Sequence, residues 1–224
     1  MFIFCFVDGS RYKVILEGLG LTLKITLFSA LLGVFLGLIL SIMSLTSERR
    51  GKKTIWSRFA YGYIDVIRGT PTVVQLMIVY FAILAPFQVD KELAAVIAFG
   101  INSSAYVSEI IRGGILSVDK GQMEAGRSLG MNYSQTMGKI IIPQAIKNIL
   151  PAMGNEAIVL LKETSIVGYI GAVDLTKAGD FIISRTYKAF MPLIAIAVVY
   201  FIIVKLMTIG LRALEGRLRK RDSR

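Results

Sequence analysis

The sequence predicts an all-α membrane protein that crosses the bilayer about five times, as a single domain over residues 1–224. Its composition is 54% hydrophobic and only 18% charged, which is too apolar for a soluble domain that must cover its surface with polar side chains. The apolar residues form runs of the ~20 residues that a helix needs to cross a bilayer core. The basic residues lie between these runs, so the net charge of +11 indicates membrane topology and excludes a nucleic-acid partner.

The first predicted span covers residues 25–47, the clearest run without a charged side chain. Within it, Gly33 and Gly37 stand four residues apart and therefore lie on one face of the helix. Small residues at this spacing let two helices approach closely. This face is predicted to pack against another helix, either within the chain or in a second copy.

The second span is predicted over residues 69–89, but Pro71 interrupts its start. Proline removes a backbone donor and ends or kinks a helix. Residues 55–68 are therefore predicted to form a separate interfacial helix, which leads into a span that begins near Thr72.

Three more spans are predicted, and charged side chains interrupt one of them, the fourth. These spans are predicted over residues 93–111, 146–170 and 189–211. An odd number of spans places the two termini on opposite sides of the membrane.

Basic residues in short loops predict the orientation, because lysine and arginine are retained on the cytoplasmic side. Three segments share this excess: Arg49, Arg50, Lys52, Lys53 and Arg58 in the first loop; Lys120, Arg127 and Lys139 in the third; and Arg212, Arg217, Arg219, Lys220, Arg221 and Arg224 in the tail. The N-terminus is therefore predicted outside and the C-terminus in the cytoplasm.

The longest cytoplasmic segment, residues 117–143, is predicted to form two short helices. Asp119 can cap the first helix, and Gly130 can end it in a left-handed conformation. Ser134 can cap the second helix, and Pro143 marks its far side. A helix–turn–helix at the membrane surface is a shape suited to docking.

This segment also carries a spaced motif: Glu124, Ala125, Gly126, Gly130, Ile140, Ile142 and Pro143. The motif resembles the Glu-Ala-Ala loop of bacterial ATP-binding-cassette importer permeases. Two positions depart from that pattern, since Gly126 replaces an alanine and Ile142 a leucine; both changes are small and are expected to leave coupling intact. Glu124 either docks on a partner or stabilises the positive end of its own helix by ~0.3–1 kcal/mol.

Further stretches extend the resemblance over nearly the whole chain and narrow it to the polar amino acid permeases of the histidine, glutamine or arginine type. They are residues 63–71, 105–114, 154–156 and 160–165. The resemblance implies a type I importer permease in the bacterial plasma membrane. Its implied partners are a cytoplasmic ATPase dimer that receives a coupling helix at about residues 120–129, an extracytoplasmic binding protein, and a second permease copy or paralogue.

The sequence itself supports this division of labour. It contains no Gly-x-x-x-x-Gly-Lys-Ser/Thr loop, so the chain is not expected to cradle ATP phosphates in that manner. We expect a non-catalytic subunit without a cofactor, a metal site or catalytic residues, while a partner subunit binds ATP.

Charge inside the fourth span calls for an explanation, because a charged group there costs ~2.5–3.5 kcal/mol. Glu156 and Glu163 stand two helical turns apart on one face, with Asn155 and Lys162 on an adjoining face. One hypothesis is that these residues and Asn102 of the third span line the substrate pathway. The alternative is that Lys162 and Glu163 neutralise each other or bridge helices.

Two pairs repeat one local pattern, an acid three residues before an arginine. They are Asp65 with Arg68, and Glu109 with Arg112. Both pairs lie toward the cytoplasmic ends of their spans and are candidates for an inner gate whose members exchange partners. The alternative is a static pair that stabilises its own helix by a few tenths of a kcal/mol.

Two other classes of function compete with import. An intramembrane hydrolase would use Ser103, Ser104 or Ser108 as its nucleophile and, because the chain has no histidine, would need Lys162 as its base. An ion-coupled secondary transporter would ordinarily show an internal repeat, which five spans do not accommodate.

Overall fold

The computed structural model describes residues 3–50 and 54–220, and almost all of them are helical. The helices are α1 (Tyr12–Arg50), α2 (Ile55–Arg68), α3 (Thr72–Met77), α4 (Lys91–Leu116), α5 (Lys120–Ser128), α6 (Tyr133–Thr136), α7 (Ile142–Glu163), α8 (Leu175–Thr186) and α9 (Phe190–Lys220). Wider π-helical turns cover Ile3–Val7, Ile78–Leu84 and Met137–Ile141, and tighter 3₁₀ turns cover Asp8–Ser10, Ala85–Phe87 and Thr164–Ile170. The predicted all-α class is confirmed, since the described residues contain no strand.

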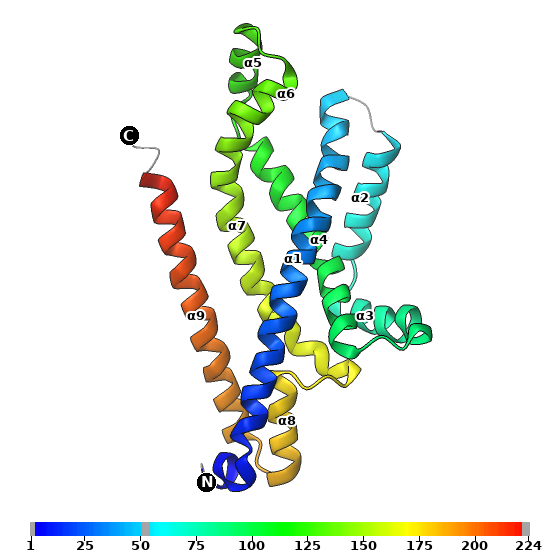
Figure 1. The fold of residues 1–224 in the computed structure, drawn as a ribbon, viewed down its shortest axis with the longest axis vertical. Coiled ribbons are helices and arrows are strands. Elements are labelled where there is room, and N and C mark those ends of the chain that lie inside the picture. Colours follow the sequence, from blue (N-terminus) through cyan, green and yellow to red (C-terminus); the bar gives the residue numbers. More distant parts are fainter. Residues whose placement is uncertain (1–2, 51–53, 221–224) are drawn as a thin grey trace.

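The centre of the molecule is the long contact between α1 and α4 (Figure 1). Gly33 and Gly37 make this contact possible. A Cβ atom on Gly33 would lie 2.9 Å from Ser103 Cβ, and one on Gly37 would lie 2.6 Å from Val107 Cγ1. The small-residue face predicted in the first span therefore packs within the chain.

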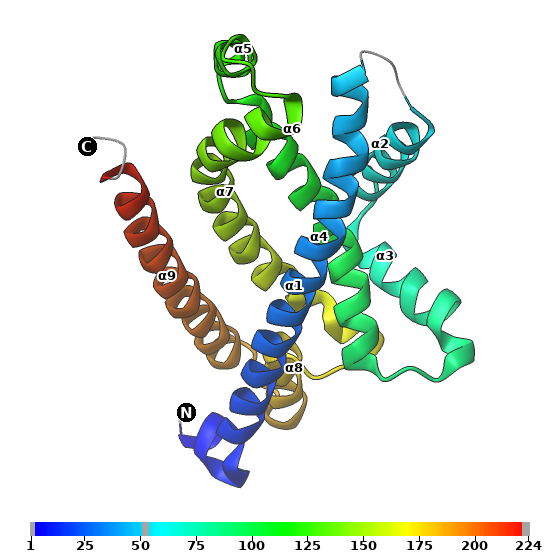
Figure 2. The ribbon, with the colours of Figure 1, turned by 45° about the horizontal axis from the view of Figure 1, so that its top comes forward.

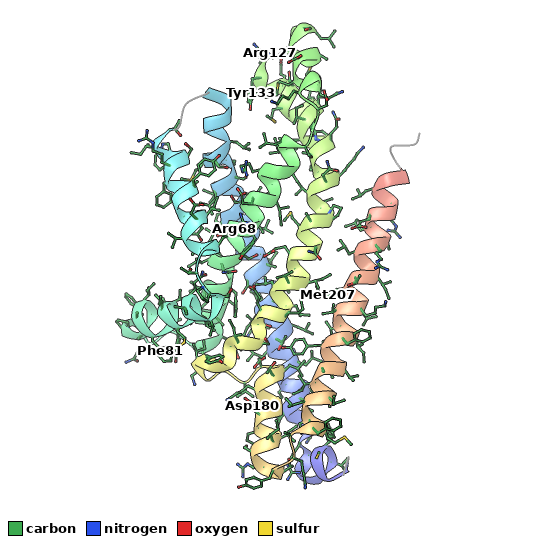
Figure 3. All side chains as sticks on the ribbon, turned by 180° about the vertical axis from the view of Figure 1, so that it is seen from behind. Arg68, Phe81, Arg127, Tyr133, Asp180 and Met207 are labelled. Atoms are coloured by element: carbon green, nitrogen blue, oxygen red, sulfur yellow. The ribbon has the colours of Figure 1, made fainter. Side chains whose placement is uncertain are left out.

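The chain bends by 106° around Pro71, between the helix at residues 55–68 and the second predicted span, so the two form separate arms. The first arm, α2, runs beside α1 and buries Ser57, Ala60 and Ile64, while the second arm turns away to the side (Figures 1 and 2). The predicted separate helix over residues 55–68 and the break at Pro71 are confirmed, while the position of this helix at the membrane interface stays a prediction. The small buried face of α2 places that arm alongside α1, and the residues after Thr72 form the lateral arm, with Phe81 near its tip (Figure 3).

Three described helices, α1, α4 and α9, are long and apolar enough to cross a membrane, or four spans if the bent pair counts as one. The sequence predicted about five. The difference is α7, whose charged and amide side chains reduce its apolar character. This helix packs against α1, α4 and α9, so much of its surface meets protein.

The two ends of the molecule differ. The C-terminal end of α1, the start of α2, the α5–α6 segment and the end of α9 lie toward one end, and the N-terminal segment and α8 lie at the other (Figures 1 and 2). The three segments predicted to be cytoplasmic thus share one end. Several of the basic residues behind that prediction lie outside the described side chains, namely Arg49, Arg50, Lys52, Lys53, Arg219, Lys220, Arg221 and Arg224.

Candidate functional site

The α5 segment is a short exposed helix at one extremity of the molecule, where Figure 3 labels Arg127. Asp119 caps it, because its Oδ1 accepts a hydrogen bond from Gly121 N at 2.7 Å. Gly130 has a φ of +82° and ends the helix in the left-handed conformation. Both predicted end signals are confirmed. Glu124 is exposed and forms no hydrogen bond or ion pair with the described residues.

The second half of the segment differs from its prediction. Asn132, and not Ser134, caps α6: Asn132 Oδ1 accepts from Gln135 N at 2.9 Å, while Gln135 Oε1 accepts from Asn132 N at 2.8 Å. The chain then continues through the π-helical turn directly into α7. Pro143 follows the π-helical turn inside this continuous rod, so it does not end a separate helix.

Gly126 is the point at which α5 rests on this continuous rod. A Cβ atom at Gly126 would lie 2.5 Å from Thr136 Cγ2 and 3.1 Å from Ile140 Cδ1. Alanine at this position would therefore collide with its neighbours. The glycine therefore sets how closely α5 can pack, while the expectation that glycine in place of the family's alanine leaves coupling intact stays a prediction.

The bend between α2 and α3 is closed by Gln75, a residue that no sequence motif indicated. Gln75 Nε2 lies 2.7 Å from Ile67 O, 3.0 Å from Thr70 O and 2.7 Å from Thr70 Oγ1, so it serves the free carbonyls at the end of α2. Gln75 Oε1 accepts from Asn102 Nδ2 of α4 at 2.9 Å. The sequence did carry one sign of this role: Gln75 is an amide within an apolar run, four residues after Pro71.

Asn102 is buried, with an exposed fraction of only 1%. Its Nδ2 donates a hydrogen bond to Gln75, while its Oδ1 has no hydrogen-bond partner among the described residues. Asn102 thus faces the bend, while its neighbour Ser103 makes a hydrogen bond to α7.

Ser103 donates a hydrogen bond to Glu156 Oε1 at 3.2 Å and joins α4 to α7. Glu156 and Glu163 are half-buried, whereas Asn155 and Lys162 are exposed. Lys162 and Glu163 form no ion pair or hydrogen bond with the described residues, but the Lys162 ammonium acts electrostatically on the Glu163 carboxylate, so the predicted neutralisation of this pair stays open. No hydrogen bond joins Lys162 to a candidate nucleophile in the described chain: Ser103 bonds Glu156, Ser104 bonds Tyr63, and Ser108 Oγ has no hydrogen-bond partner there.

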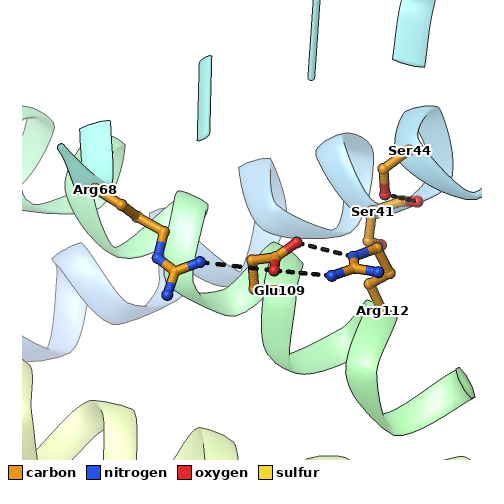
Figure 4. Close-up of polar contacts among 5 residues, drawn as sticks. All are labelled: Ser41, Ser44, Arg68, Glu109 and Arg112. Atoms are coloured by element: carbon orange, nitrogen blue, oxygen red, sulfur yellow. Dashed lines mark hydrogen bonds and ion pairs between the residues drawn. The ribbon is translucent and has the colours of Figure 1, made fainter. Parts of the chain in front are cut away.

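The candidate gate residues form one cluster in place of two pairs (Figure 4). Arg112 donates from Nε to Glu109 Oε1 at 2.9 Å and from Nη2 to Oε2 at 3.0 Å, as predicted. Arg68 reaches across from α2 and lies 3.6 Å from Glu109 Oε2, with its guanidinium 5.4 Å from the ring centroid of Tyr106.

Asp65, the partner predicted for Arg68, is exposed and forms no ion pair with the described chain. The prediction of an Asp65–Arg68 pair is therefore wrong. The spacing rule considers only one helix, and the close packing of α2 on α4 offers Arg68 a more buried acid. One glutamate thus holds two arginines, one from each helix.

Comparison with known proteins adds independent evidence on the family of this chain. Residues 30–220 match the family described as binding-protein-dependent transport system inner membrane component. The chain is 45% identical to the arginine transport system permease protein ArtQ of Bacillus subtilis (strain 168), over 93% of this chain and 94% of that protein. It is 39% identical to the glutamine transport system permease protein GlnP of Escherichia coli (strain K12), over 88% and 90% of the two chains.

Solved structures agree. A crystal structure of an amino acid ABC transporter with histidines superposes with a TM-score of 0.85 at 46% identity, covering 95% of this chain and 98% of that one. An inward-facing structure of the MetNI methionine ABC transporter gives a TM-score of 0.79 at 20% identity, covering 92% and 97%, and shares the fold.

Proposed function

Because the chain belongs to the family of binding-protein-dependent transport system inner membrane components, we propose that it lines the passage for amino acids in an ATP-driven importer. The predicted fold of an ATP-binding-cassette importer permease is confirmed by the likeness to the solved amino acid transporter. The subunit is non-catalytic, and a partner ATPase hydrolyses the ATP.

The observation that carries the proposal is the pair of half-buried carboxylates on α7. Glu156 is met by one hydroxyl, that of Ser103 at 3.2 Å, and Glu163 has no hydrogen-bond or ion-pair partner in the described chain. A carboxylate at membrane depth costs ~2.5–3.5 kcal/mol and is stabilised by a cation. The ammonium group or cationic side chain of an amino acid would supply that charge, with Asn155 beside it and Asn102 holding the adjacent bend.

The α5 segment supports the coupling part of the proposal. Glu124 and Ala125 are exposed, while Gly126 fixes the helix from behind and Gly130 fixes its end. In the proposed arrangement this surface docks on a cytoplasmic ATPase dimer, which binds the ATP, and the chain itself holds no cofactor. The α5 end then faces the cytoplasm of a bacterium, and the N-terminus faces outward.

The remaining partners lie in and beyond the membrane. A second permease copy or a paralogue completes the passage, and an extracytoplasmic binding protein delivers the amino acid. The arginine cluster around Glu109 is the proposed inner gate, since its one acid can release Arg68 of α2 while it keeps Arg112 of α4.

Uptake by the reconstituted complex tests this function. Glu156→Gln removes the charge with little change in shape and is expected to lower uptake of labelled arginine at least tenfold, about 1.4 kcal/mol. Glu17→Gln, at an exposed acid of α1, is the matched control and should leave uptake unchanged. Equal uptake by both variants and the unaltered complex would remove Glu156 from the passage.

A further inference from the structure

A polar pocket lies where the 3₁₀ turn after α7 meets α8, toward the end of the molecule opposite α5. Its volume is about 380 Å³, within the range of small-molecule sites. Its lining is Ser165, Gly168, Tyr169, Thr176, Lys177 and Asp180. Figure 3 places Asp180 toward the end of the molecule opposite Arg127. None of these residues belongs to the coupling loop, the carboxylate pair or the arginine cluster.

The position of Lys177 is set by the absence of a side chain at Gly168. A Cβ atom at Gly168 would lie 3.1 Å from Lys177 Cδ, so the glycine lets the lysine stem lie along the 3₁₀ turn. The ammonium then lies 3.4 Å from Asp180 Oδ2. Both side chains are about half exposed, at 43% and 54%, so the pair is weak and can exchange partners at small cost.

Hydrogen bonds fix the first turn of α8, which lies behind this pair. Asp174 is fully buried and caps α8 by accepting from Thr176 N and Lys177 N, each at 3.0 Å. Thr176 Oγ1 lies 3.2 Å from the Tyr200 hydroxyl of α9, and Leu175 N donates to Thr22 Oγ1 of α1 at 3.1 Å. The pocket therefore combines a well-bonded frame with two charges whose weak ion pair can open to a ligand.

From this geometry we infer that the pocket is an outer site for the backbone of a zwitterionic α-amino acid. The α-carboxylate lies on the Lys177 ammonium and the α-ammonium on the Asp180 carboxylate, which matches one pair of opposite charges with another. Tyr169, with an exposed fraction of 66%, borders the space for the side chain. Ser165 stands two residues after Glu163, so the pocket begins where α7 ends. This inference rests on the proposed function.

Equilibrium binding of labelled arginine to the complete permease–ATPase complex in nanodiscs, without binding protein, tests the site. Glu156→Gln serves as the background, because it removes the proposed inner contact and leaves the outer pocket intact. In that background Lys177→Met and Asp180→Asn are each expected to raise the Kd about fivefold, the loss of one exposed charge contact. Arg185→Met, on the same helix but stacked on Phe181, is the matched control with an unchanged Kd.

Agmatine, which is arginine without its α-carboxylate, tests whether Lys177 binds that carboxylate. We expect the background complex to bind agmatine about fivefold more weakly than arginine, and Lys177→Met to abolish that difference. Lys177→Arg should restore it. Gly168→Ala keeps every charge but displaces the lysine stem and should raise the Kd for arginine about twofold.

Unchanged affinity for arginine in Lys177→Met and Asp180→Asn overturns the inference. A complex that imports neither arginine nor glutamine contradicts the proposed function instead, so the two failures are distinct. If these variants weaken docking of the amino-acid-free binding protein, the residues form a protein contact and the inference is also overturned.

Discussion

Asn102 donates from Nδ2 to Gln75 Oε1 at 2.9 Å, and this bond ties the middle of α4 to the first turn of α3. Gln75 in turn serves the carbonyls of Ile67 and Thr70, where α2 ends. The 106° bend is thus fixed by one side chain that contacts both of its arms and a third helix.

The two amides should act as a unit. Gln75→Leu and Asn102→Leu each leave buried polar groups unpaired and are expected to cost about 1–3 kcal/mol of stability. The double variant removes both partners together, so its cost should fall about 1 kcal/mol or more below the sum. Thermal unfolding of the purified complex measures the three costs. Strict additivity would show that the bend is held by other contacts.

The arginine cluster predicts an asymmetry between two acids that look alike in the sequence. Glu109→Gln weakens the contacts to both Arg68 and Arg112. It should raise the rate of ATP hydrolysis in the absence of substrate about fivefold, which corresponds to the loss of one partly exposed ion pair. Asp65→Asn, at an acid without an ion pair in the described chain, is the matched control and should leave the basal rate unchanged. A larger effect from Asp65 than from Glu109 would reverse this assignment.

Gly126 offers a rescue experiment. Gly126→Ala pushes a methyl group against Thr136 and Ile140 and should destabilise the α5 contact by about 1–3 kcal/mol, with loss of transport and weaker co-purification of the ATPase. Thr136→Ala in the same chain removes the closest atom and should restore much of both.

Gly138→Ala is the control for the rescue, since a Cβ atom there meets nothing within 4 Å. The packing argument is wrong if Gly126→Ala behaves like this control, or if the double variant is no better than Gly126→Ala alone.

Local chemistry was readable from the sequence, while contacts between distant segments were not. Asp119 and Gly130 were predicted to delimit α5 because a cap and a left-handed glycine act within one helical turn. Gln75 was missed because its bond to Asn102 forms only after the chain bends back on α4. Arg68 was given the wrong partner because spacing along one helix says nothing of Glu109 on another.

Orientation in the membrane is the prediction on which the coupling role depends. In a Cys5→Ala background, since Cys5 is the only cysteine, Ser128→Cys and Ala189→Cys place one exposed thiol at each end of the molecule. A membrane-impermeant maleimide should label Ala189→Cys in intact cells and Ser128→Cys only in inverted vesicles, because the basic segments that share the α5 end are retained in the cytoplasm. The Cys5→Ala chain without added cysteine sets the background. The opposite pattern would place α5 outside, where no ATPase can reach Glu124, and would contradict the coupling role of this loop.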